Sequence, residues 1–540
     1  MISGKLNEFI SLFVGDTDTP PRRADQWRIE TETAAGPSRF GFFHGALDTR
    51  KNELSCGAAR SGSGFMNPAV KLARQVDRGT DRIGLHTYRL CAGDLNKSIT
   101  RGKQGPPKES TASGRIRLMA HIGFLPVPVK GHMYPASSLA LHLQQRGHRI
   151  TFFCIADSAT FFREYGLACV VVGGESFPIG YVDRVFGKLG KLKGQAGVLY
   201  TMKQFEQLID MHFAELPAAI QARQVDALVI DQFHMGGGAV ADHLQLPYVH
   251  AAMALIFIAE SGVPPINMDW GPETHPWARL RNAMVNALAR RMLQPVHRKI
   301  NAQRVAWGLA PHARYPNDMF ASHPQISQQP PSFEFPRREL PPEFHFVGPL
   351  HSEKTRRKTD FPWERLDGRP ILYASLGTLQ NGLEWIFRVI LAACAGLDAQ
   401  LVLSLGGNMD PVRFSGTAGN PIVVKFAPQL ELLEHAALCI THAGLNTALE
   451  SLACGVPMVA IPITNDQPGV AARIAWCGVG EFLTPRRLTV PRLRAAVHRV
   501  WSTPAYRENA QRLQREIAGL RSLDYASEVI EAGIRRQDVP

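Results

Sequence analysis

The pattern of apolar and polar positions along the chain predicts two successive α/β domains. Short apolar runs alternate with amphipathic stretches of helical period between residues 117 and 350, and the alternation resumes at residue 370. Strands of a parallel sheet are covered by helices on both faces, so they read as continuous apolar runs of this kind. The expected strands are HIGFLPVP, HRITFFCIA, CVVVGG, VDALVID and LPYVHAA, then ILYASLGT, LDAQLVLSLGG, PIVVKFAP, ALCITHAG and VPMVAIPI.

The same pattern divides the chain into five parts. Residues 1–116 lack sustained periodicity and are broken by Gly, Ser, Pro and charged clusters, which predicts a disordered and dispensable extension. Residues 117–350 and 370–520 are the two expected Rossmann-like, doubly wound domains, facing each other across a cleft. Residues 351–369 are the expected linker, and residues 521–540 an expected helix that crosses back to the first domain.

Composition narrows the class of protein. The formal charge is +13, from 60 Lys and Arg against 47 Asp and Glu, but the basic excess is concentrated in the predicted extension and forms no basic, aromatic-interleaved groove. This argues against a nucleic-acid partner. The 8 cysteines show no CxxC or metal spacing, which indicates reduced thiols in a cytoplasmic protein. No apolar run reaches the roughly 18 to 20 residues that a membrane span needs.

Polar residues gather around one predicted strand-helix unit of the second domain. His442 and Gly444 follow a strand, and Asn446, Thr447 and Glu450 occupy the first turns of the next helix. Unpaired N–H groups and the positive end of the dipole make a helix N-terminus suited to an anion such as a diphosphate. Glu450 lies one turn deeper on the same face, where its carboxylate can accept hydrogen bonds from two ribose hydroxyls.

The next strand end adds Asp466 and Gln467, which can bind sugar hydroxyls from the other side. Together these residues describe a nucleotide-sugar pocket. Each residue also has a plainer interpretation: a structural histidine, a helix cap, or a solvated helix face.

A second group of residues in the first domain suits an acid-base reaction. His132 stands in KGHMYP, expected as the loop between the first strand and the first helix, and Asp231 ends VDALVID. Carboxyl ends of parallel strands meet at one edge, so these side chains can come together. His132 would then take a proton from an acceptor hydroxyl, and Asp231 would fix its tautomer. The plainer alternatives are a structural histidine and a helix cap.

The spacing of these motifs resembles the donor signature of the UDP-glycosyltransferases of glycosyltransferase family 1, which have the GT-B fold. FAPQ, HAGLNTALES and NDQ occur in the family's order, and SLGT resembles its second phosphate-side loop. One departure is Phe426, where the plant signature has Trp. The resemblance implies a base-stacking and donor set of Phe426, Gln429, Ser375, Gly377 and Thr378, a diphosphate set of His442, Gly444, Asn446 and Thr447, a ribose ligand in Glu450, sugar ligands in Asp466 and Gln467, and a catalytic pair in His132 and Asp231.

The stretches QISQQPPSFEFPRRELPPEFHFVGPL and YASLGTLQ resemble the bacterial zeaxanthin glucosyltransferases, and the similarity spans most of the chain from about Ala120 onward. This similarity implies inverting transfer of a hexose, expected to be glucose, from UDP-glucose to a lipophilic hydroxylated acceptor such as a carotenoid. It implies no metal and no further cofactor. Apolar residues over 251–265 and around Tyr200 are candidates for the acceptor pocket. Basic and apolar residues interleaved over 184–205 suggest peripheral contact with the inner face of a membrane.

Other functions remain open at this point. The acceptor can instead be a macrolide, polyketide, phenolic or sterol. A sugar-nucleotide epimerase would use a similar donor site, but it has no use for a His-Asp pair beside an apolar pocket. A non-catalytic sugar-nucleotide or lipid-binding protein would explain the donor loop alone.

Overall fold

The computed structural model describes residues 119–535, except residues 190, 191, 193, 194, 274, 357, 358, 379–381 and 408. All described residues belong to one compact unit. The predicted extension over residues 1–116 lies outside the described residues.

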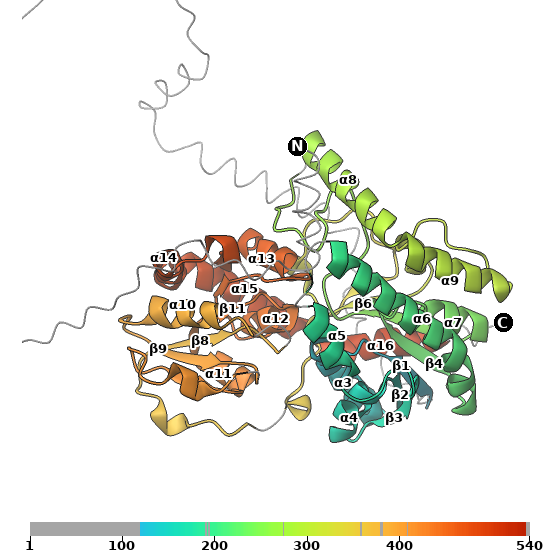
Figure 1. Cartoon of the computed structure of the whole chain (residues 1–540), viewed down its shortest axis with the longest axis horizontal. Coiled ribbons are helices and arrows are strands. Elements are labelled where there is room, and N and C mark those ends of the chain that lie inside the picture. The colour runs from blue at the N-terminus through green and yellow to red at the C-terminus, as the bar shows by residue number, and fades with distance from the viewer. Residues whose placement is uncertain are drawn as a thin grey trace, which may run out of the picture. The chain divides into compact units, whose positions relative to one another are not determined.

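The first lobe is built on a parallel sheet in the order β3-β2-β1-β4-β5-β6-β7 (Figure 1). Alternate residues of its strands face opposite layers: Ile122 and Phe124 of β1 pack with helices α3 and α16, and Leu125 with α6 and α7. The strands are β1 (His121–Leu125), β2 (Arg149–Cys154), β3 (Ala168–Val171), β4 (Ala227–Asp231), β5 (Tyr248–Ala252), β6 (Gln325–Ser327) and β7 (Phe344–Phe346). The helices are α3 (Lys130–Gln145), α4 (Ala156–Glu164), α5 (Tyr181–Leu189), α6 (Gln195–Ala222), α7 (Gly237–Leu244), α8 (Pro276–Met292) and α9 (Gln294–Ala306).

The second lobe repeats this architecture with a parallel sheet in the order β10-β9-β8-β11-β12-β13. Its two apolar layers contain α11, α12, α13 and α15 on one face, and α10 and α14 on the other. The strands are β8 (Ile371–Ser375), β9 (Gln400–Ser404), β10 (Ile422–Val424), β11 (Ala436–Thr441), β12 (Met458–Ala460) and β13 (Gly480–Phe482). The helices are α10 (Glu384–Cys394), α11 (Gln429–His435), α12 (Leu445–Ala453), α13 (Gln467–Trp476), α14 (Val490–Ser502), α15 (Pro504–Leu520) and α16 (Ser522–Arg535).

The predicted fold class, two tandem doubly wound parallel sheets, is confirmed. Helix α3 ends just before Gly147, which takes the left-handed conformation (φ 102°) common after helices. One local prediction is wrong. His132 lies in the first turn of α3, which begins at Lys130, and not in a loop before the helix. The domain boundaries drawn from the sequence stay predictions.

The C-terminal helix α16 packs against the first lobe. Val529 and Ile530 join the apolar layer that contains α3, and Glu531 accepts a hydrogen bond from Arg146 Nε at 2.7 Å. The chain turns between α15 and α16 at Arg521, a non-glycine residue in the left-handed region (φ 47°). The chain therefore ties its last helix to the first sheet after completing the second.

A buried ion pair joins the two lobes. Arg473 on α13 is fully buried and reaches Glu334, which follows β6 and is 2 % exposed. Arg473 also lies over the ring of Phe335, with its guanidinium carbon 4.2 Å from the ring centre. No helix among the described residues has both the length and the apolar character that crossing a bilayer needs.

Candidate active site

The predicted site residues lie where the strand order of each sheet reverses. In the first lobe the reversal falls between β1 and β4, where Leu125 pairs with Ile230. In the second it falls between β8 and β11, where Thr441 pairs with Ser375. Open α/β sheets bind ligands at such reversals, beyond the carboxyl ends of the strands.

His132 and Asp231 form a pair at the first of these reversals. His132 follows β1 in the first turn of α3, Asp231 is the last residue of β4, and His132 Nδ1 lies 2.7 Å from Asp231 Oδ2. Since a carboxylate only accepts, Nδ1–H donates, and the lone pair of the neutral imidazole is left on Nε2. Asp231 is itself held by the backbone N–H of Phe233, at 2.9 Å.

The environment of this pair sets the basicity of the imidazole. Burial lowers the pKa of His132, but the charge and hydrogen bond of Asp231 outweigh this effect, and the net pKa is raised. Asp466, from the second lobe, adds a smaller effect in the same direction. A base whose pKa is raised above its usual value near 6.5 is a stronger proton acceptor.

The ring of His442 lies between two glycines that leave room for it. A Cβ atom added at Gly377 or Gly444 would come within 2.7 Å and 2.5 Å of the ring, and Gly377 also has a positive φ of 73°. Burial lowers the pKa of His442 to about 4, so the ring is neutral at pH 7 and offers one N–H. Its Nδ1 is buried without a hydrogen-bond partner.

The N-terminus of α12 follows directly. Gly444 is the N-cap and supplies no capping side chain, while Ala443 before it has φ 63°, a strained conformation for a residue with a side chain. Asn446 in the first turn reaches into the first lobe, where its Nδ2 donates to Gly131 O at 2.6 Å. This contact joins the donor helix to the residue next to His132.

Glu450, the predicted ribose ligand, is 2 % exposed and engaged from two directions. Gln429 Nε2 donates to its Oε2 and lies 3.4 Å from Thr447 Oγ1. Arg356, from the predicted linker, forms an ion pair with its other oxygen. Arg356 is placed by its neighbour Thr355, whose hydroxyl lies 2.8 Å from Ser138 Oγ of α3.

The other predicted donor residues lie around this centre. Asp466 Oδ2 accepts from Leu255 N of the first lobe at 3.3 Å, and burial raises the pKa of Asp466. Gln467 turns its carboxamide oxygen to the backbone N–H groups of its own loop, and Ser375 Oγ accepts from Gly377 N. Thr378 is half-buried at the end of that loop, and Phe426 is 43 % exposed. Asp466 is the N-cap residue of α13, but its side chain makes no capping hydrogen bond.

An apolar cavity of about 60 Å³ lies beside the His132–Asp231 pair. Its walls include the segment before His132, part of α6 and the turn after Asp231. Phe233 connects the cavity to the pair, because Phe233 lines the cavity and its ring centre lies 6.0 Å from that of His132. Two neutral imidazoles, His212 and His234, stack in the wall with ring centres 4.0 Å apart. A small apolar group with a polar end fits this composition.

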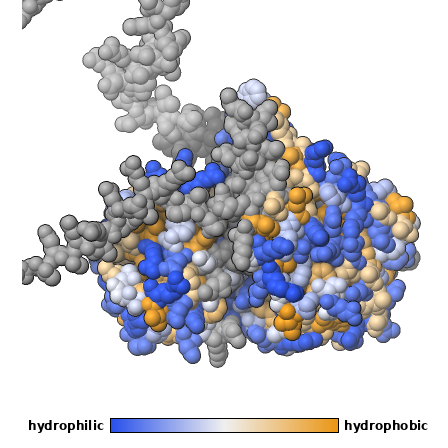
Figure 2. Space-filling view, in the orientation of Figure 1, coloured by the Kyte–Doolittle hydropathy of each residue, from blue (hydrophilic) through white to orange (hydrophobic). Residues whose placement is uncertain are grey.

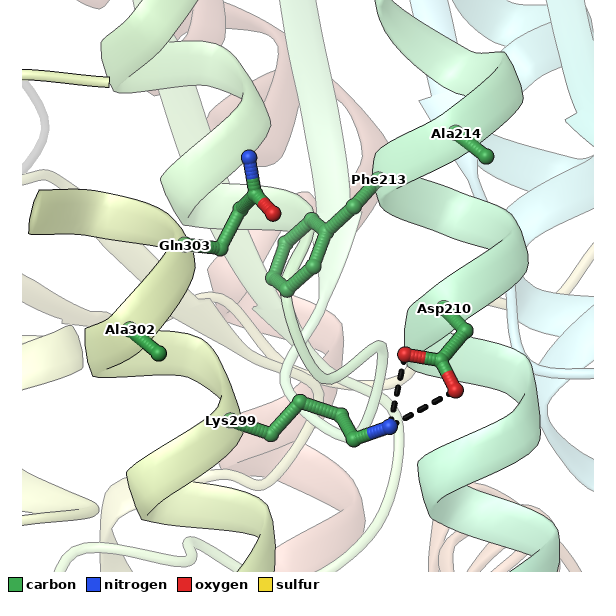
Figure 3. Close-up of a pocket in the computed structure, with 6 residues that line it drawn as sticks. All are labelled: Asp210, Phe213, Ala214, Lys299, Ala302 and Gln303. Carbon is green, nitrogen blue, oxygen red and sulfur yellow. Dashed lines mark hydrogen bonds and ion pairs between the residues drawn. The ribbon is translucent and has the colours of Figure 1, made fainter. Parts of the chain in front are cut away.

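A wider groove of about 550 Å³ lies between α6 and α9 (Figure 3). Lys299 reaches across it to both carboxylate oxygens of Asp210 at 2.6 Å, with Phe213 beside them. None of the predicted site residues lines this groove.

Some residues of the site were not predicted from the sequence. Arg356 was included in a linker because its surroundings are rich in Pro and charge, and nothing in that pattern points to Glu450. Gln328, whose Nε2 donates to Asn446 Oδ1 at 2.9 Å, follows a strand of only three residues. His212 stands inside the long helix α6, where an isolated histidine carries no signal.

Comparison with known proteins agrees with this geometry. Residues 200–531 match the family described as UDP-glucoronosyl and UDP-glucosyl transferase. The zeaxanthin glucosyltransferase of Pantoea ananas is 33% identical over 365 residues, which cover 67% of this chain and 84% of that protein. The chain belongs to the UDP-glycosyltransferase family. A second relative of the family, the 4'-demethylrebeccamycin synthase of Lentzea aerocolonigenes, is 28% identical and covers 75% of this chain and 97% of that protein.

Solved structures of glycosyltransferases share the fold. The calicheamicin glycosyltransferase CalG4 superposes with a TM-score of 0.60 at 24% identity, covering 78% of this chain and all of that one. The glycosyltransferase VinC, in complex with dTDP, superposes with a TM-score of 0.57 at 20% identity, covering 77% of this chain. The predicted GT-B fold of this family member is thereby confirmed.

Proposed function

We propose that this enzyme transfers glucose from UDP-glucose to a hydroxyl of a lipophilic acceptor, with a hydroxylated carotenoid as the first candidate. The observation that carries the proposal is the His132–Asp231 pair, which lies beside an apolar cavity. Gly131, next to His132, accepts a hydrogen bond at 2.6 Å from Asn446 Nδ2 of helix α12. The similarity to the zeaxanthin glucosyltransferase of Pantoea ananas supports the choice of zeaxanthin and glucose.

The proposed reaction is one displacement with inversion. Nε2 of His132 takes the acceptor proton while the hydroxyl oxygen attacks the anomeric carbon, and the bond from that carbon to the β-phosphate oxygen breaks. Asp231 stabilises the imidazolium that forms. The leaving diphosphate is received by the N–H groups at the start of α12 and by the neutral ring of His442.

The described positions support the remaining donor contacts that we propose. Glu450 binds the ribose after Arg356 gives way, Phe426 stacks on the base, and Asp466 with Gln467 binds the transferred sugar. We expect no metal and no further cofactor, so activity should persist in excess EDTA. Because every described cysteine is a free thiol, we propose a cytoplasmic protein that meets its acceptor at the inner face of a membrane.

A second acceptor class has support of its own. The Lentzea relative is named for a demethylrebeccamycin, so another small lipophilic metabolite is the alternative acceptor. The His132–Asp231 pair would have no role in an epimerase or in a non-catalytic binding protein.

The test is a screen of purified protein against UDP- and dTDP-sugars and against zeaxanthin, macrolide, phenolic and sterol acceptors, measuring nucleotide diphosphate release and glycoside formation. We expect release that depends on both UDP-glucose and zeaxanthin. Turnover with another acceptor only would replace the carotenoid, and no acceptor-dependent release in any combination would contradict transferase activity.

A further inference from the structure

Helix α8 presents an apolar stripe that the rest of the lobe does not cover. Trp277, Leu280 and Met284 are 74%, 48% and 64% exposed, and their spacing of three and four residues places them on one helix face. The opposite face is held to the protein by Ala278 and Asn282, whose Nδ2 donates to Ser261 O at 3.3 Å. Hydrophobic and hydrophilic residues alternate along the edge that α8 occupies (Figures 1 and 2).

The charges around this stripe have one sign. Residues 275–306, which span α8 and α9, contain 7 Arg and Lys and no Asp or Glu. Three of the seven are paired with acidic residues from elsewhere: Arg281 with Glu273, Lys299 with Asp210 and Arg304 with Asp242. Within the described part of the chain the other four have no acidic partner, and they are Arg279, Arg290, Arg291 and Arg298.

The stripe is connected to the acceptor side of the site through a short segment. The ring centre of Phe233, which lines the apolar cavity, lies 4.9 Å from that of Phe257. Four residues later, Ser261 holds α8 through Asn282. A surface that binds through α8 therefore lies a few contacts away from the proposed acceptor cavity.

We propose that α8 docks on an anionic lipid bilayer, with Trp277, Leu280 and Met284 entering the headgroup boundary and the unpaired arginines facing lipid phosphates. Tryptophan and arginine beside an apolar helix face are the features of interfacial helices. Each basic residue near an anionic surface adds to the attraction. This inference rests on the proposed function in one respect: docking on a bilayer would give the enzyme access to a lipophilic acceptor.

The proposed docking face differs from the one expected from the sequence. In the stretch over 184–205, Lys188 lies over the ring of Tyr200 at 4.8 Å, and Leu199 is 70% exposed. Lys191 and Lys193 lie outside the described residues. Like residues 275–306, residues 184–205 contain no Asp or Glu, but Asp183 and Glu206 border them directly.

The test is cosedimentation of the full chain with vesicles of phosphatidylglycerol mixed with phosphatidylcholine, and with phosphatidylcholine alone. We expect binding to the mixed vesicles that weakens with salt. The variants Trp277→Ser/Leu280→Ser/Met284→Ser and Arg279→Glu/Arg290→Glu should each lower the partition coefficient about tenfold or more. Matched controls from exposed positions of the second lobe, Val412→Ser and Arg487→Glu/Arg515→Glu, should bind as the wild type does.

The outcomes separate the rival explanations. No vesicle binding by the wild type overturns the proposal. If Lys188→Glu/Leu199→Ser loses vesicle binding and the α8 variants keep it, the membrane contact lies in residues 184–205, and the proposal for α8 is overturned. The stripe instead contacts a second copy of the chain if the wild type does not bind vesicles, forms a dimer in sedimentation velocity, and loses that dimer in the α8 serine variant. This outcome also overturns the proposal. Transfer to a water-soluble acceptor should be unchanged in the α8 variants; if no transfer occurs but vesicles bind, only the proposed function fails.

Discussion

At the scale of single residues, the site depends on side chains whose properties are set by close neighbours. Asp231 determines the tautomer and the basicity of His132. Burial between Gly377 and Gly444 keeps His442 neutral. Arg356 forms an ion pair with the carboxylate of Glu450, which is expected to bind the ribose. Each of these relationships gives a measurable effect on binding or on pH dependence.

Replacing Asp231 should move the acidic limb of the pH profile. The base must be unprotonated, so with a raised pKa the wild type should lose kcat/KM as pH falls through a value above about 6.5. In Asp231→Asn the main effect that raises the pKa of His132 is gone and burial lowers it, so the limb should shift to lower pH. The rate at the plateau should also fall roughly 10²- to 10⁴-fold, because the tautomer is no longer fixed. An unchanged limb would contradict the role of Asp231.

Removing Arg356 should strengthen donor binding. Glu450 cannot accept ribose hydroxyls while it is paired with Arg356, so only a fraction of the protein is competent to bind, and the apparent Kd is raised by that fraction. We expect Arg356→Ala to lower the Kd for UDP about fivefold in calorimetry. The control is Lys354→Ala, an exposed basic residue of the same segment, which should leave the Kd unchanged. Weaker binding in Arg356→Ala would instead show that Arg356 holds the donor.

At the scale of elements, the site is made by turns that follow parallel strands. The turn from β11 to α12 places His442, the strained Ala443 and the free helix N-terminus within four residues. Strain of this kind persists where the surrounding structure holds it and clusters at functional sites.

Filling the space at Gly444 should damage this turn without unfolding the lobe. The φ of Gly444 is −65°, which alanine accepts, but its Cβ would lie 2.5 Å from His442 Nε2. We expect Gly444→Ala to displace the ring and raise the Kd for UDP about tenfold, roughly the loss of one charge-assisted hydrogen bond. The control is Gly174→Ala, where a Cβ meets nothing within 4 Å. Unchanged UDP binding in Gly444→Ala would remove His442 from the donor site.

The elements also show which parts of the structure can be predicted from sequence. Long apolar runs such as those of β4 and β11 identify strands because both faces are buried, and the strand order then places His132, Asp231 and His442 at reversals. The strands β6, β7 and β13 were not predicted, because QIS, FHF and GEF form no sustained apolar run. Contacts between distant segments, such as Arg356 with Glu450, depend on the fold and have no local signal.

At the scale of the whole molecule, the two lobes are joined by polar contacts, of which the Arg473–Glu334 pair is buried. Asn446 reaches Gly131, Asp466 accepts from Leu255, and Arg473 pairs with Glu334. Two of these contacts involve residues of the proposed donor site, so assembly of the lobes and assembly of the site are connected.

Breaking the buried pair should strongly destabilise the protein. In Arg473→Met the Glu334 carboxylate loses its main partner while it stays 2 % exposed, and removing one member of such a pair costs about 3 to 5 kcal/mol. Urea unfolding measures this loss. The control is Arg499→Met, whose pair with Glu481 is exposed and should contribute about 1 kcal/mol or less. Equal effects in the two variants would contradict a tightly held contact between the lobes.

The central claim is that His132 activates an acceptor beside a donor that the second lobe holds independently. It is tested most directly by His132→Ala, comparing acceptor-dependent UDP release with calorimetric binding of UDP. The account predicts that transfer falls about 10²-fold or more while the Kd for UDP stays within about twofold of the wild type. Transfer at the wild-type rate in His132→Ala would contradict it.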